Sequence, residues 1–285
     1  MEEASSRWQE LGGATAPSGT ESCTQRAWDD GVCTIKADRL LNSTDSVGRA
    51  RLLASVAPGS GSWLHALPFS SLGLRLSNEE LRIAVGLRLG APLVRPHRCD
   101  CGTEVEENGH HGLSCGRSAG RHRRHALAND VIIRAIRSIN VHAELEPSRL
   151  LNDDLKRPDG ATLDPWHHGK YLVWNFTCTD TLAPSHLNRS STAAGSAAVM
   201  AEGRKRAKYS QLANSGLYYF VPVAIETLGT WGPSALEICS EIGGRIARCT
   251  GDVRSSFFLR QRMDIAIQKG NAAAVQGTIH GNVLA

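Results

Sequence analysis

Apolar residues recur every three or four positions in two early parts of the chain, a spacing that predicts helices. These residues are Leu40, Leu41, Val47, Leu52, Leu53 and Val56 in the first run, and Leu81, Ile83, Ala84, Leu87 and Leu89 in the second. Ser77-x-x-Glu80 has the spacing of a capping box and marks the start of the second helix. We therefore expect residues 36–94 to be a helical linker region. Residues 1–35 are rich in Ser, Gly, Thr and acidic residues without a sustained period, which predicts a disordered tail.

From residue 119 onward the pattern alternates between helical and strand periods. It predicts helices over 119–139, 190–213, 233–249 and 253–268, and strands over 141–146, 161–163, 171–179 and 218–226. This alternation is typical of a mixed α/β domain. We assign that domain to residues 119–270 and treat 271–285 as a tail.

A cluster of cysteine and histidine residues lies between the two regions, over residues 95–118. Its members are Cys99, Cys101, His111 and Cys115. Three thiolates and one imidazole within such a short segment can close around a tetrahedral zinc ion, so we predict a CCHC zinc knuckle. His110 is an alternative ligand to His111, and unliganded buried thiols are the alternative to a metal site.

Basic residues are concentrated directly after this cluster. The net charge is only +4, but six arginines lie between Arg117 and Arg137 against one acidic residue, Asp130. Such a stripe is typical of a surface that contacts phosphate, although a solvated helix face has the same pattern. The residues that we expect to bind nucleic acid are Arg121, Arg123, Arg124 and His125.

Candidate residues for phosphodiester chemistry follow in the α/β domain. Hydrolysis of a phosphodiester at neutral pH calls for a divalent cation held by acidic residues at strand ends. Asp159 follows Pro158, and Asn175 lies in the next predicted strand. Lys205 and Lys208 lie on one side of a predicted helix. The alternatives are a Pro-Asp-Gly turn for Asp159 and a solvated helix face for the lysines.

The order of these motifs resembles the C-terminal region of site-specific non-LTR retrotransposon polyproteins, over residues 95–225. In that family a zinc knuckle precedes a restriction-like endonuclease of the PD-(D/E)XK fold. The resemblance implies an α/β fold with a restriction-endonuclease-like mixed sheet flanked by helices, preceded by the knuckle and a helical N-terminal region. The front helices would then correspond to the linker after the family's reverse transcriptase, and the chain would be a fragment or a stand-alone tail.

The resemblance also implies roles for single residues. Asp159 matches the family's first magnesium-binding aspartate, Asn175 the second acidic position, and Lys205 or Lys208 its lysine. His125 resembles a basic position after the knuckle. Glu144 or Glu146 could serve as an auxiliary acid. Asn175 departs from the pattern, because a neutral amide binds Mg²⁺ more weakly than a carboxylate and cannot act as a base.

The first functional expectation is a metal-dependent DNA endonuclease domain with structural zinc and catalytic Mg²⁺ or Mn²⁺. DNA is its expected partner, with RNA as the alternative, and no membrane is involved. An inactive zinc-dependent nucleic-acid-binding module and a protein-interaction domain with structural zinc are the two alternatives. The sequence has no long apolar run and no secretory signal, which predicts an intracellular protein, with the nucleus as the expected site.

Overall fold

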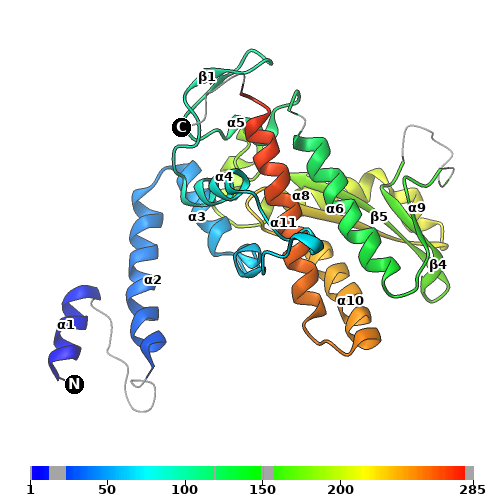
Figure 1. Cartoon of the computed structure of the whole chain (residues 1–285), viewed down its shortest axis with the longest axis horizontal. Coiled ribbons are helices and arrows are strands. Elements are labelled where there is room, and N and C mark those ends of the chain that lie inside the picture. Colours follow the sequence, from blue (N-terminus) through cyan, green and yellow to red (C-terminus); the bar gives the residue numbers. More distant parts are fainter. Residues whose placement is uncertain (1, 13–23, 119, 149, 151–156, 280–285) are drawn as a thin grey trace. The chain divides into compact units, whose positions relative to one another are not determined.

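The computed structural model describes residues 2–12, 24–118, 120–148, 150 and 157–279 (Figure 1). The chain divides into two compact units, residues 1–49 and 50–285. Among the described helices, none is both long and apolar enough to cross a lipid bilayer.

The described part of the first unit includes α1 (Glu2–Gly12), α2 (Gln25–Ser43) and the first residues of a third helix, which begins at Ser46. Trp8 and Trp28 join α1 and α2: the rings meet edge to face with centroids 5.8 Å apart, and Trp8 Nε1 donates to the Trp28 carbonyl at 2.8 Å. This corrects the expectation of a disordered tail over 1–35 for its described part. The contact joins residues twenty positions apart, so a local hydrophobic period could not reveal it. Residue 1 and residues 13–23 lie outside the described residues.

The predicted linker region is helical in the structure. Its elements are α3 (Ser46–Val56), the short 3-10 helices η2 (Ser62–His65) and η3 (Ser70–Leu72), and α4 (Asn78–Leu89). The capping box that opens α4 is confirmed. The Glu80 amide donates to Ser77 Oγ at 3.2 Å, and the Ser77 amide donates to Glu80 Oε2 at 2.9 Å.

The second unit is built on a mixed four-stranded sheet, which confirms the predicted α/β class. The strands are β3 (Ala143–Leu145), β4 (Gly160–His167), β5 (Lys170–Thr179) and β6 (Tyr218–Glu226), in the order β3-β4-β5-β6. Only β5 and β6 are parallel. Between them the chain crosses over through α7 (Pro184–Ser190), α8 (Ser196–Lys208) and α9 (Ser210–Asn214). A parallel pair requires such a long crossover.

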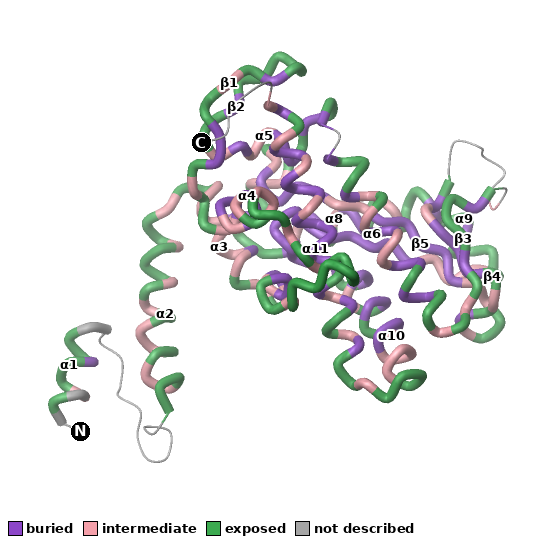
Figure 2. Tube along the Cα trace, in the orientation of Figure 1, coloured by how far each residue is buried: buried purple, intermediate pink, exposed green. Residues whose placement is uncertain are grey.

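Helices cover both faces of this sheet. Alternate residues of β5 face opposite sides, so Trp174 and Phe176 pack in one cluster with α6 (Gly120–Arg137), α10 (Pro233–Thr250) and α11 (Ser255–Gln276). Val173 packs on the other side against Tyr209 and the α9 residue Leu212. Figure 2 shows the resulting buried layer along the sheet and α11.

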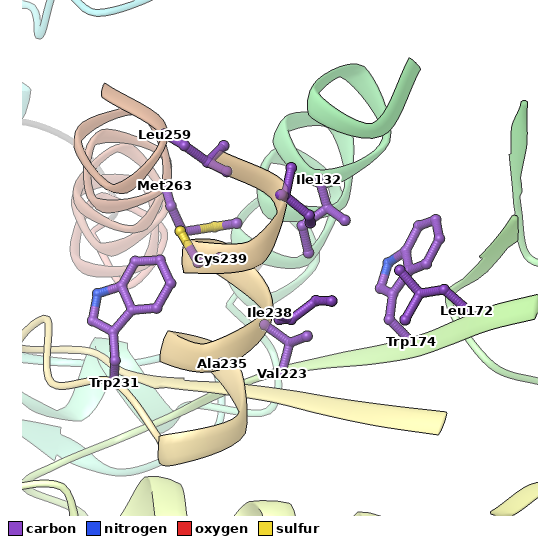
Figure 3. Close-up of a pocket in the computed structure, with 11 residues that line it drawn as sticks. Ile132, Leu172, Trp174, Val223, Trp231, Ala235, Ile238, Cys239, Leu259 and Met263 are labelled. Atoms are coloured by element: carbon purple, nitrogen blue, oxygen red, sulfur yellow. The ribbon is translucent and has the colours of Figure 1, made fainter. Parts of the chain in front are cut away.

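The larger cluster encloses a small apolar pocket of about 20 Å³ (Figure 3). Trp174 and Trp231 lie on two sides of it, with Met263 and Cys239 between them. Its lining is apolar, so we regard it as a packing defect with no chemistry of its own.

Helix α11 is central, which corrects the predicted tail over 271–285. Asn271, Ala272 and Val275 have no exposed surface, and the helix continues to Gln276. Helices α6 and α11 lie side by side (Figure 1). Gly270 allows this approach, because a Cβ there would lie 1.8 Å from the side chain of Arg124. Residues 280–285 lie outside the described residues.

Candidate metal centre and nucleic-acid site

The four predicted zinc ligands come together. Cys99 and Cys101 lie around the hairpin of β1 (His97–Arg98) and β2 (Glu104–Val105), and the short helix α5 (His111–Ser114) presents His111 and is followed by Cys115. All four ligand atoms lie within 4.8 Å of one another. Cys99 Sγ is 3.7 Å from Cys115 Sγ, and Cys101 Sγ is 3.1 Å from His111 Nε2.

This donor set fits zinc, because three thiolates and one imidazole are typical of a closed structural site. His111, and not His110, belongs to the group. Hydrogen bonds from Thr103 lower the pKa of the Cys101 thiol to about 6, whereas burial raises that of Cys99 to about 11. A bound zinc ion would hold both as thiolates.

The knuckle is attached to the end of α11. Ser118 Oγ donates to the Ala274 carbonyl at 3.0 Å, and His97 Nε2 lies 3.2 Å from Thr278 Oγ1. A Cβ on Gly112 would lie 2.7 Å from the Ala274 carbonyl oxygen, so the knuckle packs directly on the helix backbone. Metal binding would therefore also stabilise the helix that runs through the core.

Asp159 directly precedes β4, whose first residue, Gly160, pairs with Trp174 of β5. The Asp159 amide donates to the Trp174 carbonyl at 3.0 Å, which completes the ladder between the two strands. The Phe176 amide on β5 donates instead to Asp159 Oδ2 at 2.6 Å. A Cβ at Gly160 would lie 2.0 Å from the Trp174 ring, so this position requires glycine. These contacts hold the Asp159 carboxylate beside β5.

Two side chains from opposite faces of the sheet reach the same carboxylate. His125 of α6 places Nε2 2.9 Å from Asp159 Oδ2, and Asn175 of β5 donates from Nδ2 to Oδ1 at 2.9 Å. The hydrogen bond to Asp159 is the main reason that the pKa of His125 is raised. Both carboxylate oxygens are therefore engaged by N–H groups.

The orientation of the Asn175 amide follows from its neighbours. Asp159 can only accept, and the Tyr209 hydroxyl uses its proton to donate to the Arg157 carbonyl at 2.9 Å. The Asn175 nitrogen, which lies 3.5 Å from the Tyr209 oxygen, must face both acceptors. Asn175 is 3% exposed, and its amide oxygen has no hydrogen-bond partner among the described residues.

A divalent cation does not fit this arrangement. Mg²⁺ requires oxygen ligands directed at it, usually one or two carboxylates. Here Asp159 faces three N–H groups, and Asn175 presents its nitrogen at the point where a second carboxylate would hold the cation. Asp159 and Asn175 do come together as the resemblance implied, but as a hydrogen-bonded pair.

A basic pocket of about 410 Å³ lies beside this pair. Its lining includes Arg121 and His122 of α6, Lys205 of α8 and Thr177 of β5, together with His125. Burial lowers the pKa of Lys205, although the nearby charge of Asp159 opposes that shift. None of the described residues that line the pocket is acidic. An anionic group would meet several donors here.

Lys208 lies apart from this pocket. It is exposed, and its Nζ is 5.2 Å from the centre of the Tyr209 ring. Of the two candidate lysines, only Lys205 lines the pocket.

The arginines of α6 differ in role. Arg121 is exposed at the pocket, and Arg123 lies 3.5 Å from Glu80. Arg124 is 2% exposed and donates to Asn271 Oδ1 at 2.9 Å and to the Leu113 carbonyl at 2.6 Å. These bonds give Arg124 a structural role that joins α6, α11 and the knuckle. Arg124 also belongs to the lining of the basic pocket, so its contact with phosphate stays a prediction.

Sequence reasoning missed several residues that shape the site. Asn129 accepts from Trp174 Nε1 at 2.9 Å, and its amide nitrogen lies 3.3 and 3.5 Å from the two ring nitrogens of His125. It contacts the ring as a whole and does not fix its tautomer. Tyr209 orients Asn175. The helical spacing of four residues from His125 to Asn129 and from Lys205 to Tyr209 is the signal that could have found both.

The other described acidic residues of the α/β domain do not line the basic pocket. Asp164 accepts from the His142 amide at 2.6 Å, and Asp180 accepts from the Leu182 amide at 3.1 Å. Glu144 and Glu146 are exposed. Glu146 is hydrogen-bonded to the site through its backbone amide, which donates to the Asp159 carbonyl at 2.9 Å, and its charge is a minor cause of the raised pKa of His125.

No protein-family model matches this chain, and a comparison with curated proteins also found no match.

Proposed function

We propose that this chain is a zinc-stabilised nucleic-acid-binding domain of the retroelement endonuclease type, and that it holds DNA through phosphate contacts without a divalent cation. The observation that carries the proposal is the basic pocket beside Asp159. Arg121, His122 and Lys205 converge there from two helices, and no described lining residue is acidic. Phosphate contacts of this kind supply most of the affinity for nucleic acid.

The order of motifs supports the proposed lineage. A CCHC cluster, an arginine-rich helix and the Asp159 turn follow one another as in the polyproteins that the sequence resembles. A mixed sheet with helices on both faces is compatible with a restriction-endonuclease-like fold. Such a fold would bring the aspartate and the next strand together, as Asp159 and Asn175 are here.

The hydrogen bonds that the Asp159 carboxylate accepts favour DNA binding over hydrolysis. Three N–H groups surround Asp159, and the neutral Asn175 cannot supply the second charge that attracts Mg²⁺. The second candidate function, a metal-dependent endonuclease, is favoured by the presence of His125 and Lys205 in one pocket, with His125 Nε2 2.9 Å from Asp159 Oδ2.

Incubation with supercoiled plasmid and Mg²⁺ or Mn²⁺ separates these functions. The purified chain, Asn175→Asp and Asp159→Ala would each be assayed for nicking and for binding to duplex DNA, with RNA as competitor. We expect the parent chain to bind DNA with a steep salt dependence and not to nick it, and Asn175→Asp to gain nicking. Nicking by the parent that is lost in Asp159→Ala would instead establish the endonuclease. Absence of binding would overturn the proposal in favour of a protein-interaction domain.

A further inference from the structure

Lys205 has the setting of a reactive amine. Its side chain is half-buried in the wall of the basic pocket, opposite the arginine-rich start of α6. It lies close enough to Asp159 and His125 for their charges to act on one another. Desolvation favours the neutral form of a lysine, which is the form that attacks carbonyl carbon.

We propose that Lys205 gives this chain a metal-independent lyase activity on abasic sites in DNA. The inference rests on the proposed DNA binding. The substrate class is the ring-opened aldehyde of a deoxyribose that has lost its base, flanked by phosphodiesters. No divalent cation takes part, so the hydrogen bonds that occupy the Asp159 carboxylate do not prevent the reaction.

The steps balance without an oxidant or reductant. Lys205 Nζ forms a bond to C1′ of the aldehyde, and the carbonyl oxygen leaves as water, which yields an imine. A C2′ proton then passes to Nδ1 of a neutral His125, whose Nε2–H donates to Asp159 Oδ2. The electron pair of that C–H bond forms a C2′–C3′ double bond while the C3′–O bond breaks, and the phosphate leaves on the downstream strand. Water hydrolyses the imine and restores the amine.

The pocket suits this substrate in size and charge. A volume of about 410 Å³ admits a sugar with one adjoining phosphate, and Arg121 and His122 stand at its wall to contact that phosphate. The cost of moving a nucleotide out of the stack is lowest for a damaged position. An abasic sugar can therefore enter a pocket that the proposed function assigns to the DNA backbone.

Borohydride trapping tests the proposal, because it reduces the imine to a stable covalent adduct. The whole chain would be incubated, without added divalent cation, with labelled duplex DNA carrying one abasic site. The variants are Lys205→Arg, which keeps the charge but cannot form an imine, and Lys170→Arg as the matched control. Lys170 begins β5, at the opposite end of that strand from Thr177 in the pocket wall.

We expect an adduct with the parent chain and with Lys170→Arg, and at least a ~10-fold lower yield with Lys205→Arg. A duplex carrying a tetrahydrofuran analogue, which has no aldehyde, should be bound but not trapped. Binding without trapping, or an adduct that persists in Lys205→Arg, would overturn the lyase and leave the proposed binding function standing. Failure to bind intact and abasic duplex alike would overturn the proposed function itself. Equal melting temperatures for Lys205→Arg and the parent exclude misfolding as the cause of a loss.

Discussion

Replacement of Asn175 by aspartate should destabilise the folded chain when no divalent cation is present. The amide nitrogen of Asn175 donates to Asp159 Oδ1 at 2.9 Å, and the side chain is 3% exposed. The substitution removes this hydrogen bond and sets a second carboxylate against the first. Two like charges 4 Å apart repel by about 4 kcal/mol at an effective dielectric constant near 20. With the lost hydrogen bond and with relaxation of the side chains, we expect a loss of about 3–5 kcal/mol of unfolding free energy at neutral pH.

The sign of the pH dependence follows from the same repulsion. The neighbouring charge and burial both raise the folded-state pKa of the introduced carboxyl above its unfolded value of about 3.9. The variant should therefore match the parent most closely below about pH 4, and its deficit should grow as the pH rises through the raised folded pKa. A divalent cation bound between the two carboxylates should reduce the deficit at neutral pH.

Urea unfolding measures this directly, at about pH 5 and pH 8, with and without Mg²⁺ or Ca²⁺. Asn175→Ala is the control, because it loses the hydrogen bond without adding charge and should show neither the pH dependence nor the cation dependence relative to the parent. An Asn175→Asp chain as stable as the parent at pH 8 without a cation would refute the assignment of the amide nitrogen to Asp159.

Three further predictions concern the knuckle, the buried arginine and the histidine pair. Chelation of zinc should lower Tm by at least ~5 °C in the parent and leave Cys115→Ser unchanged, as measured by differential scanning fluorimetry. Arg124→Met should lower the unfolding free energy by about 2–4 kcal/mol, because it leaves two buried acceptors without their donors, whereas Arg121→Met at the exposed pocket should change it by less than ~0.5 kcal/mol. Asp159 raises the pKa of His125, so the pair contributes fully to the unfolding free energy below about pH 6.5, and this contribution is lost as the pH rises through the folded-state pKa. The difference in unfolding free energy between the parent and His125→Gln should therefore be larger at about pH 5.5 than at about pH 9.

The parts of the fold that depend on local pattern could be predicted from the sequence. The apolar face of α6, the β-branched run of β5 and the capping box of α4 each involve residues within a few positions of one another. The four candidate zinc ligands also lie close together in the sequence, so their grouping could be predicted, and they are close in space.

The chemistry of the carboxylate could not be predicted, because its partners come from distant segments. The Asp159 carboxylate accepts hydrogen bonds from His125 of α6, from the Phe176 amide and from the Asn175 side chain, which lie 16 to 34 residues away in the sequence. The sequence shows that Asn175 is neutral, but only the structure shows that its amide nitrogen, and not its oxygen, faces the carboxylate. The state of the site depends on that orientation.

Two other buried carboxylates also have partners that the local sequence does not reveal. Glu202 accepts from the amides of Ser234 and Ala235 at 3.2 and 3.1 Å, and so caps the start of α10. Glu226 accepts from the amides of Ala197 and Ala198 and caps α8. Glu202 lies within α8 and Glu226 ends β6, and each caps a helix that is distant in the sequence, so local pattern does not reveal either role.

We propose that the basic pocket holds DNA without a divalent cation. Fluorescence anisotropy of a labelled duplex tests it most directly, with the parent chain and Arg121→Ala/Lys205→Ala compared over a series of salt concentrations in magnesium-free buffer. We expect binding without Mg²⁺, and a slope of log affinity against log salt that is shallower in the variant by roughly 0.9 for each cation removed. Binding that requires Mg²⁺, or a variant that keeps both the affinity and the slope of the parent, would contradict this proposal.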